Sequence, residues 1–386
     1  MSFIMNIRSV AKYESKILVR SWFFRIFTLL AVVFLGFFNF AMMLMEDNFG
    51  LWFAKSVSSN IPYLNLLLLN TGQAVVAVFL SSEFLKRDKK LDTSEAFYVR
   101  PLSNAEYVVG KIWGNLRVFL FLNLLVLAIV LAFNFMASGV TVDLPAYLVY
   151  FFLISIPTLI FIIGLSIFLM LLLKNQALTF ILLLGYIGLT LFYIQDKFYY
   201  LFDYMVYNLP LFKSTIVGFS NLELILNHRA IYFFAGLGFI FFTIFLFKRL
   251  PNARRSHYPW LFLSFCMFLL MVTAGFRHVR SILWEGEMRA LYTSINNKYV
   301  YEPKMAIDYY DISVEQKSET IRSVVGMEGT ALAASEVFIF CLNPGLRVEE
   351  VKDGEKSLNF KREEQILAVD FGRKIEKGDT ISFSVS

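Results

Sequence analysis

The chain has 386 residues, of which 58% are hydrophobic and 17% are charged, and its formal net charge is +6. This apolar surplus exceeds what a soluble core of that size can bury, so the composition excludes an ordinary soluble domain and predicts that lipid surrounds much of the chain. A basic balance in such a chain is typical of cytoplasmic loops, and we do not expect a nucleic-acid-binding protein.

Residues 1–21 predict a cytoplasmic interfacial amphipathic helix. Apolar residues recur there at helical spacing, whereas Arg8, Lys12, Lys16 and Arg20 lie on other faces. Such a helix can either anchor the chain in the headgroup region or offer its cationic face to a partner. No small-residue cleavage site follows a short hydrophobic core, so we do not expect a cleaved signal peptide.

Seven apolar runs follow, each near the ~20 residues that a helix needs to cross a bilayer core about 30 Å thick. They cover residues 22–45, 61–82, 112–137, 146–173, 177–195, 230–248 and 258–276. The runs are continuously apolar and do not alternate, which favours helices over the strands of a membrane barrel. The sequence therefore predicts an α-helical multi-pass membrane protein, with six spans in residues 22–250 and a seventh in residues 251–280.

Lysine and arginine are distributed unequally between the two sets of loops. With the N-terminus inside, sixteen of them fall on the cytoplasmic side, and only Lys55, Lys197, Lys213 and Arg229 fall outside. The positive-inside rule therefore predicts a cytoplasmic N-terminus. Seven spans then place the C-terminal domain on the extracytoplasmic side.

The longest cytoplasmic loop, residues 83–111, is dense in charges of both signs. A loop that only reconnects two helices can be a few residues long, so this one is expected to fold into a docking surface. Ser103 followed by Glu106 fits a capping box at the start of a helix that runs into the third span.

Three polar side chains fall within the second span. Asn70 and Gln73 are close to one another on the helix surface, whereas Asn65 lies about 140° away from Asn70. Hydrogen bonds between helices are the favoured interpretation, because buried polar groups need partners. The alternative is that these side chains line a translocation path.

The aromatic stretch in residues 196–229 is interrupted by Asp203, Pro210, Lys213 and Glu223. Charges in mid-bilayer cost ~2.5–3.5 kcal/mol each on insertion scales, so a full crossing is not expected. We predict short interfacial helices on the outer face that meet near Pro210 and keep Asp203 and Lys213 close to water. The candidate outer gate is formed by residues of this stretch: Tyr199, Tyr204, Tyr207 and Pro210.

Residues 281–386 are charged and alternating, which predicts a small all-β domain with Asp353 and Gly354 in a hairpin turn. The last residues continue a strand pattern, so we expect the sequence to be a fragment of a longer protein. Cys266 lies in an apolar run and Cys341 in the β-domain, and both are expected to be free.

No catalytic or metal-binding cluster is predicted. His228, His257 and His278 sit singly near the ends of apolar runs, without an H-E-x-x-H pair, and are interpreted as interfacial side chains. Gly110-Lys111 is not part of a phosphate-binding loop, because no upstream glycine has the required spacing. ATP hydrolysis would have to come from a partner, and no directly bound cofactor is expected.

The loop after the second span carries a pattern of a threonine, acidic residues, Arg-Pro-Leu-Ser and Gly-Lys. The matching residues are Glu83, Thr93, Ser94, Glu95, Arg100, Pro101, Leu102, Ser103, Gly110 and Lys111. Together with the N-terminal helix and the aromatic outer segment between the fifth and sixth spans, this pattern resembles the ABC-2 type permease family over about residues 3–250.

The resemblance implies the transmembrane permease subunit of an ATP-driven exporter in the bacterial cytoplasmic (inner) membrane, with a hydrophobic or amphipathic substrate. A separate ABC ATPase subunit would carry ATP and Mg, and a second permease copy would complete the path within membrane lipid. The residues expected to couple to the ATPase are Glu14, Lys16, Arg20, Glu83, Lys86, Arg87, Asp88, Lys89, Lys90, Glu95, Arg100 and Lys111.

The C-terminal segment resembles the start of the N-terminal β-domain of gluzincin-type zinc aminopeptidases, with Asn343-Pro344-Gly345-Leu346 and Gly354 as landmarks. Two alternatives to a transporter follow, namely a membrane-tethered peptidase-like protein and a scaffold that presents the β-domain. Seven spans and an elaborate cytoplasmic loop exceed what an anchor requires, which favours the permease.

Overall fold

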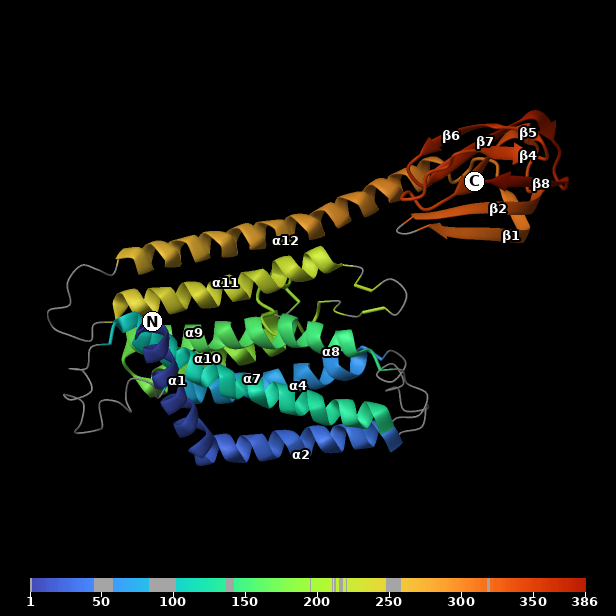
Figure 1. Cartoon of the computed structure of the whole chain (residues 1–386). Helices are drawn as coiled ribbons and strands as arrows, with labels where there is room; N and C mark the ends of the chain where they lie inside the picture. Colours follow the sequence, from blue (N-terminus) through green and yellow to red (C-terminus); the bar gives the residue numbers. More distant parts are fainter. Residues whose placement is uncertain are drawn as a thin grey trace. The chain divides into compact units, whose positions relative to one another are not determined.

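The computed structural model describes residues 2–44, 58–82, 102–136, 142–194, 196–209, 211, 213–214, 218–219, 221–247, 258–317 and 320–386. The chain divides into two compact units, Met1–Ser281 and Ile282–Ser386. The first unit is built of helices, and the second contains the sheets (Figure 1).

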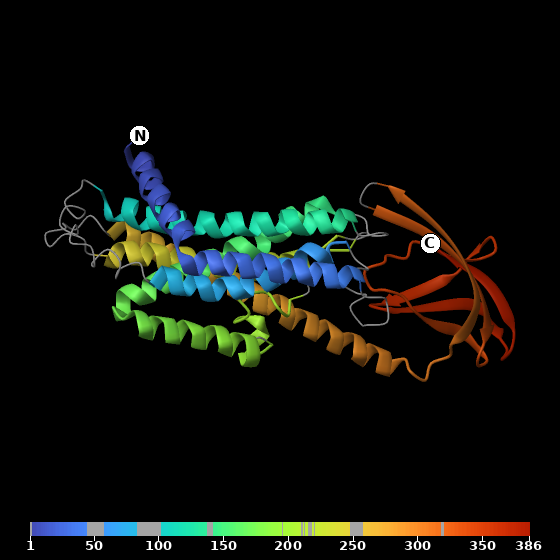
Figure 2. The same cartoon turned by 90° about the horizontal axis from the view of Figure 1, so that it is seen from below.

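The helices of the first unit are long rods, and α1 runs at an angle to the others (Figure 2). Their bounds are α1 Ser2–Arg20, α2 Trp22–Leu44, α4 Asn60–Ser82, α7 Asn104–Met136, α8 Leu144–Tyr150, α9 Ile156–Leu173, α10 Gln176–Leu189, α11 Leu222–Leu246 and the first part of α12 Tyr258–Lys298. A π-helical turn, Phe151–Ser155, joins α8 to α9, and a second one, Thr190–Ile194, extends α10. Within the described residues, seven rods are long and apolar enough to cross a membrane, which confirms the prediction of seven apolar helices.

Three of these helices extend well beyond the predicted apolar runs. α7 begins at Asn104, where the capping box of Ser103 and Glu106 predicts its start, whereas α11 begins at Leu222 and not near 230, and α12 continues to Lys298. Residues 281–298 were predicted to belong to the β-domain and are helical, and the first strand begins at Met305. Apolarity marks the surface that suits lipid, whereas a helix ends where its backbone hydrogen bonds end, so the polar terminal turns of α11 and α12 were not predicted.

Glycines allow α9 and α11 to approach closely. A Cβ added to Gly236 would lie 2.7 Å from the carbonyl carbon and oxygen of Ile160, and one added to Gly164 would lie 2.7 Å from the carbonyl oxygen of Gly236. Small residues bring membrane helices together in the same way. In contrast, α2 and α10 turn large side chains outward, and Phe37 and Ile181 are 69% and 64% exposed. Such outward apolar faces suit lipid and not water.

The second unit contains two antiparallel sheets. The five-stranded sheet has the order β1-β2-β8-β4-β5, and the three-stranded sheet has the order β3-β7-β6. The strands are β1 Met305–Lys317, β2 Thr320–Ala331, β3 Ser335–Cys341, β4 Val351–Asp353, β5 Lys356–Ser357, β6 Asn359–Glu363, β7 Ile366–Ile375 and β8 Thr380–Val385. Phe338, Phe371 and Phe383 share one buried core, in which strands of both sheets meet.

Two sequence predictions for this region are confirmed. Asp353 pairs with Lys356 across a tight hairpin, and Gly354 between them has a φ of +61°, which favours glycine. Cys266 and Cys341 are both free.

Candidate functional site

The N-terminal helix α1 packs against the N-terminal half of α7. Ala11 is fully buried at this contact. A Cβ added to Gly114 would lie 2.7 Å from Cβ of Glu14 and 2.9 Å from the carbonyl oxygen of Ala11, and one added to Gly110 would lie 2.7 Å from Cβ of Val10. Gly110 and Gly114, four residues apart on one face of α7, therefore allow α1 to pack closely against α7.

A buried ion pair lies inside this contact. Nζ of Lys111 is 3.1 Å from Oε1 of Glu14, and the two side chains are only 1% and 3% exposed. Arg117, six residues after Lys111 on α7, donates to the carbonyl oxygen of Ala11 at 2.7 Å and to the hydroxyl of Ser15. Glu14 and Lys111, both expected to couple to the ATPase, are therefore buried against each other, and a role of either in coupling stays a prediction.

The start of α7 has the predicted capping box. The hydroxyl of Ser103 accepts from the backbone N–H of Glu106 at 3.2 Å, and a carboxylate oxygen of Glu106 accepts from the N–H of Ser103 at 2.6 Å. The other oxygen of Glu106 accepts from Asn6 of α1 at 2.9 Å. The capping residues of α7 therefore also hold the first turns of α1.

The outward side of α1 keeps a cationic face. Lys12, Lys16 and Arg20 are exposed there, so two of the predicted coupling residues are accessible. The remaining predicted coupling residues lie outside the described residues: Glu83, Lys86, Arg87, Asp88, Lys89, Lys90, Glu95 and Arg100. Exposed apolar side chains on α1, such as Ile4 at 65%, are also compatible with the predicted anchoring at a lipid interface.

The polar residues of the second span, now α4, are hydrogen-bonded between helices as expected. Asn70 donates to Asn123 of α7 at 3.1 Å and to Ser155 at 3.2 Å, and Asn123 donates to Gln73 at 2.9 Å. Ser155 lies on the π-helical turn between α8 and α9, a feature that is frequent at functional sites. We call Asn70, Gln73, Asn123 and Ser155 the polar core cluster.

Asn65 lies apart from the polar core cluster. It exchanges two hydrogen bonds with Asn39 of α2, at 2.7 Å and 3.0 Å. Because Asn65 and Asn70 lie on different faces of α4, Asn65 contacts α2 and Asn70 contacts α7. A role of either group in a translocation path stays a prediction.

The aromatic segment between α10 and α11 differs from the prediction. The described residues from 196 to 209 form a short 3-10 turn, Phe198–Tyr200, followed by further turns, and not two interfacial helices. Asp203 and Tyr204 are 1% and 0% exposed, so the expected proximity of Asp203 to water was wrong. Burial is possible because the Asp203 carboxylate accepts the backbone N–H of Asn208 at 2.8 Å, which provides a local partner.

The predicted members of the outer gate differ in solvent exposure. Tyr199 and Tyr207 are 45% and 42% exposed, whereas Tyr204 is buried, and Pro210 lies outside the described residues. Lys213 is partly exposed and forms an ion pair with Asp143, with 2.7 Å between Nζ and the carboxylate oxygen. A gate made of all four predicted residues stays a prediction.

Two histidines and a tyrosine hold this segment by its backbone. The ring Nε2 of His278 in α12 is 2.8 Å from the carbonyl oxygen of Tyr199, and that of His228 in α11 is 3.0 Å from the carbonyl oxygen of Tyr200. Tyr232 donates to the next carbonyl oxygen along the chain. The two imidazole rings are 5.1 Å apart, so the prediction that these histidines sit singly was wrong. We call His228, Tyr232 and His278 the carbonyl clamp.

Arg229 was predicted in an outer loop and lies inside α11, 3% exposed. Its guanidinium donates to the carbonyl oxygens of Leu153 at 2.7 Å and Tyr204 at 2.9 Å, and to the hydroxyl of Thr158 at 2.9 Å. Arg229 therefore joins the aromatic segment to the π-helical turn and to α9. The sequence carries no signal for this role, because the acceptors are mostly backbone atoms.

Across the described ranges, no group of three or more histidine, cysteine, aspartate or glutamate side chains could hold a metal ion. Comparison of the sequence with protein-family models and with curated proteins gave no match.

Proposed function

We propose that the chain is the membrane-spanning permease subunit of an ATP-driven exporter similar to the ABC-2 type transporters. Its N-terminus would be cytoplasmic, six spans would form the transporter core, and the seventh span would lead to a β-unit outside the cytoplasm. A separate ATPase would hydrolyse ATP with Mg, and two permease copies would form the path for a hydrophobic or amphipathic substrate.

The observation that carries this proposal is the docking of α1 onto α7 through the buried pair of Glu14 and Lys111. α7 begins at Asn104, within residues 83–111, the charged segment expected to meet the ATPase. A push on the loop or on the exposed face of α1 would therefore move α7 and α1 together. A helix that only anchors a chain in the headgroup region does not need a buried ion pair with a span, which supports coupling over anchoring.

The polar core cluster gives secondary support for a path. Oδ1 of Asn70 and Nε2 of Gln73 are buried and have no hydrogen-bond partner. A free acceptor and a free donor on one helix could exchange hydrogen bonds with a polar group that passes between the helices. Unpaired polar atoms in an apolar bundle are otherwise destabilising, so their presence is consistent with a functional role.

The proposal is tested by reversing the charges of Arg87, Lys89 and Lys90 to glutamate in the full-length chain. We expect normal membrane insertion but reduced co-purification of ATPase activity, because exposed interface charges steer and register docking. The control reverses Lys356 and Lys377, which are exposed on the second unit. Unchanged co-purification and unchanged transport in the loop variant would refute the proposal.

The sidedness is tested separately with single cysteines at Lys89 and Lys356, after Cys266 and Cys341 are replaced. An impermeant thiol reagent applied to intact spheroplasts should label position 356 and spare position 89. Labelling of position 89 alone would reverse the proposed topology.

A further inference from the structure

The β1–β2 hairpin of the second unit has an apolar face that extends beyond the core. Residues directly opposite each other in an antiparallel pair share a face, and Met327 lies opposite Tyr310 while Val325 lies opposite Ile312. Met305, at the core end of β1, is 8% exposed, whereas Tyr310 and Ile312 are 52% and 59% exposed. The same hairpin therefore contributes both to the packed core and to an apolar surface open to a ligand.

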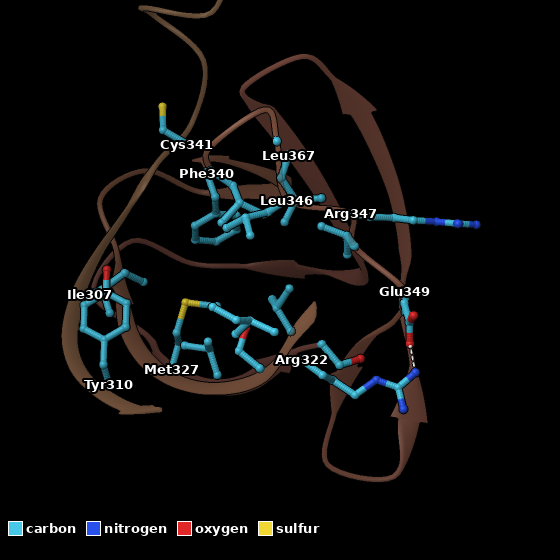
Figure 3. A pocket seen from close by; sticks show the side chains of 18 of the residues that line it. Ile307, Tyr310, Arg322, Met327, Phe340, Cys341, Leu346, Arg347, Glu349 and Leu367 are labelled. Carbon is cyan, nitrogen blue, oxygen red and sulfur yellow. Dashed lines mark hydrogen bonds and ion pairs between the residues drawn. The ribbon is translucent and has the colours of Figure 1, made fainter. Parts of the chain in front are cut away.

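A cleft of about 900 Å³ lies against this hairpin. Figure 3 shows Met327 pointing into the cleft from β2, and Phe340, Leu346 and Leu367 pointing toward it from the opposite wall. Small-molecule sites typically have volumes of ~300–1,000 Å³ and mostly apolar walls. Two facing apolar walls suit a narrow apolar chain, whereas another sheet or helix would need a broad open face.

The size of the cleft favours a single chain. If a methylene group occupies ~30 Å³, about the share of one water molecule in the liquid, a sixteen-carbon chain fills roughly 500 Å³. One such chain fits within the cleft of about 900 Å³, and two side by side do not. A fatty acid therefore fits better than a lipid with two acyl chains.

Charged residues gather at one end of the cleft. Arg322 on β2 and Glu349 on the opposite wall form an ion pair, with 2.9 Å between nitrogen and oxygen, and this pair closes that end of the cleft in Figure 3. Arg347 also lines the cleft and extends outward beside the pair. Arg347 has no ion-pair partner among the described residues, so its guanidinium is open to an anion, while Glu315 of β1 also lines the cleft and lies opposite Arg322. An anionic head group is favoured there.

We propose that the cleft binds a long-chain fatty acid, with its acyl chain between Met327 and the wall formed by Phe340 and Leu346, and its carboxylate beside Arg347. The inference rests on the second unit alone and holds whether or not the first unit transports a substrate. A second copy of the chain is the competing occupant, and the test distinguishes it from a fatty acid.

The test uses the full-length chain in phosphatidylcholine nanodiscs and a palmitate probe with a photoactivatable group in its chain. Adducts are mapped by peptide mass spectrometry. We expect saturable labelling on β2 and on the segment from 340 to 349, and competition by palmitate that is about tenfold stronger than competition by hexadecanol. Arg347→Glu should abolish this preference for palmitate, because the uncharged alcohol does not use the arginine.

Two matched variants separate binding from folding. Leu346→Asp places a carboxylate in the cleft and should lower labelling there about tenfold. Val324→Asp alters the opposite face of β2 and should leave labelling unchanged. The two side chains are 51% and 47% exposed, so neither change is expected to unfold the unit, and equal protease resistance of the variants checks this.

Three outcomes would overturn the inference. The first is labelling confined to the first unit, and the second is labelling of the cleft that palmitate does not compete away. The third is an equal effect of Leu346→Asp and Val324→Asp. Chemically cross-linked dimers that are lost in Leu346→Asp, without palmitate-sensitive labelling, would assign the surface to a second copy of the chain instead.

Discussion

Replacement of Lys111 by methionine is expected to undock α1 from α7. Methionine keeps most of the length of the side chain but removes its charge, so the carboxylate of Glu14, 3% exposed, loses the ammonium group 3.1 Å away. Removal of one partner from a buried ion pair costs ~3–5 kcal/mol. We take about 3 kcal/mol, because α1 lies at the edge of the unit and water reaches the carboxylate once the helix opens. This loss corresponds to an increase of about 100-fold in the undocked population.

Native-state trypsin digestion in detergent micelles measures that population. Trypsin cuts extended chain, so cleavage at Lys12 and Lys16 requires α1 to detach and unfold locally, and the rate follows the open fraction when closing is fast. The double variant Glu14→Leu/Lys111→Met restores a neutral, apolar contact and should be cleaved within about tenfold of the native rate, since well-packed apolar pairs can replace buried ion pairs. A single variant cleaved within threefold of the native rate would show that the ion pair does not hold α1.

Two further predictions concern packing and pH. Gly236→Ala should lower the unfolding temperature in detergent, because overpacking typically costs ~1–3 kcal/mol. Gly185→Ala, where an added Cβ meets nothing within 4 Å, should leave it unchanged or raise it, and equal losses in both variants would contradict the close crossing of α9 and α11. In the second unit, hydrogen bonds from the Tyr299 hydroxyl and from a lysine ammonium lower the pKa of Glu363 below its ordinary value of 4.5. The resulting stabilisation is present above pH 4.5 and is lost as the pH falls through the lowered pKa. Glu363→Gln should therefore flatten the pH dependence of the proteolysis rate of this unit between pH 6 and 3. The same pH dependence of that rate in both proteins would refute this.

The helical part of the fold could be predicted because lipid imposes a length and an apolar composition on each span. Continuous apolar runs identify the rods, and local capping rules identified the start of α7 at Ser103 and Glu106. The ends of α11 and α12 could not be predicted, since polar turns there gain partners from distant elements. His278 stabilises such a turn through a contact 79 residues away in sequence.

The candidate site was predictable only where partners follow from helical spacing. Asn65 and Asn70 could be assigned to different faces from their numbers alone. The burial of Lys111 could not be predicted, because its partner lies on another helix. A charged residue near a predicted loop is usually expected to be exposed. Arg229 was missed for a related reason, since its acceptors are mainly backbone oxygens that any sequence provides.

The carbonyl clamp has a mechanical consequence. Phe198, Tyr199 and Tyr200 all have positive φ values, of 52°, 58° and 62°, a conformation that costs ~1–2 kcal/mol for each such residue. Two bonds of the clamp come from α11 and one from α12, so this turn keeps its shape only while both helices stay in place. Any movement that separates α12 from α11 would release a strained turn whose next residues lead directly into the buried Asp203 and Tyr204. The conformational strain of this turn therefore couples the position of α12 to the packing of the aromatic segment.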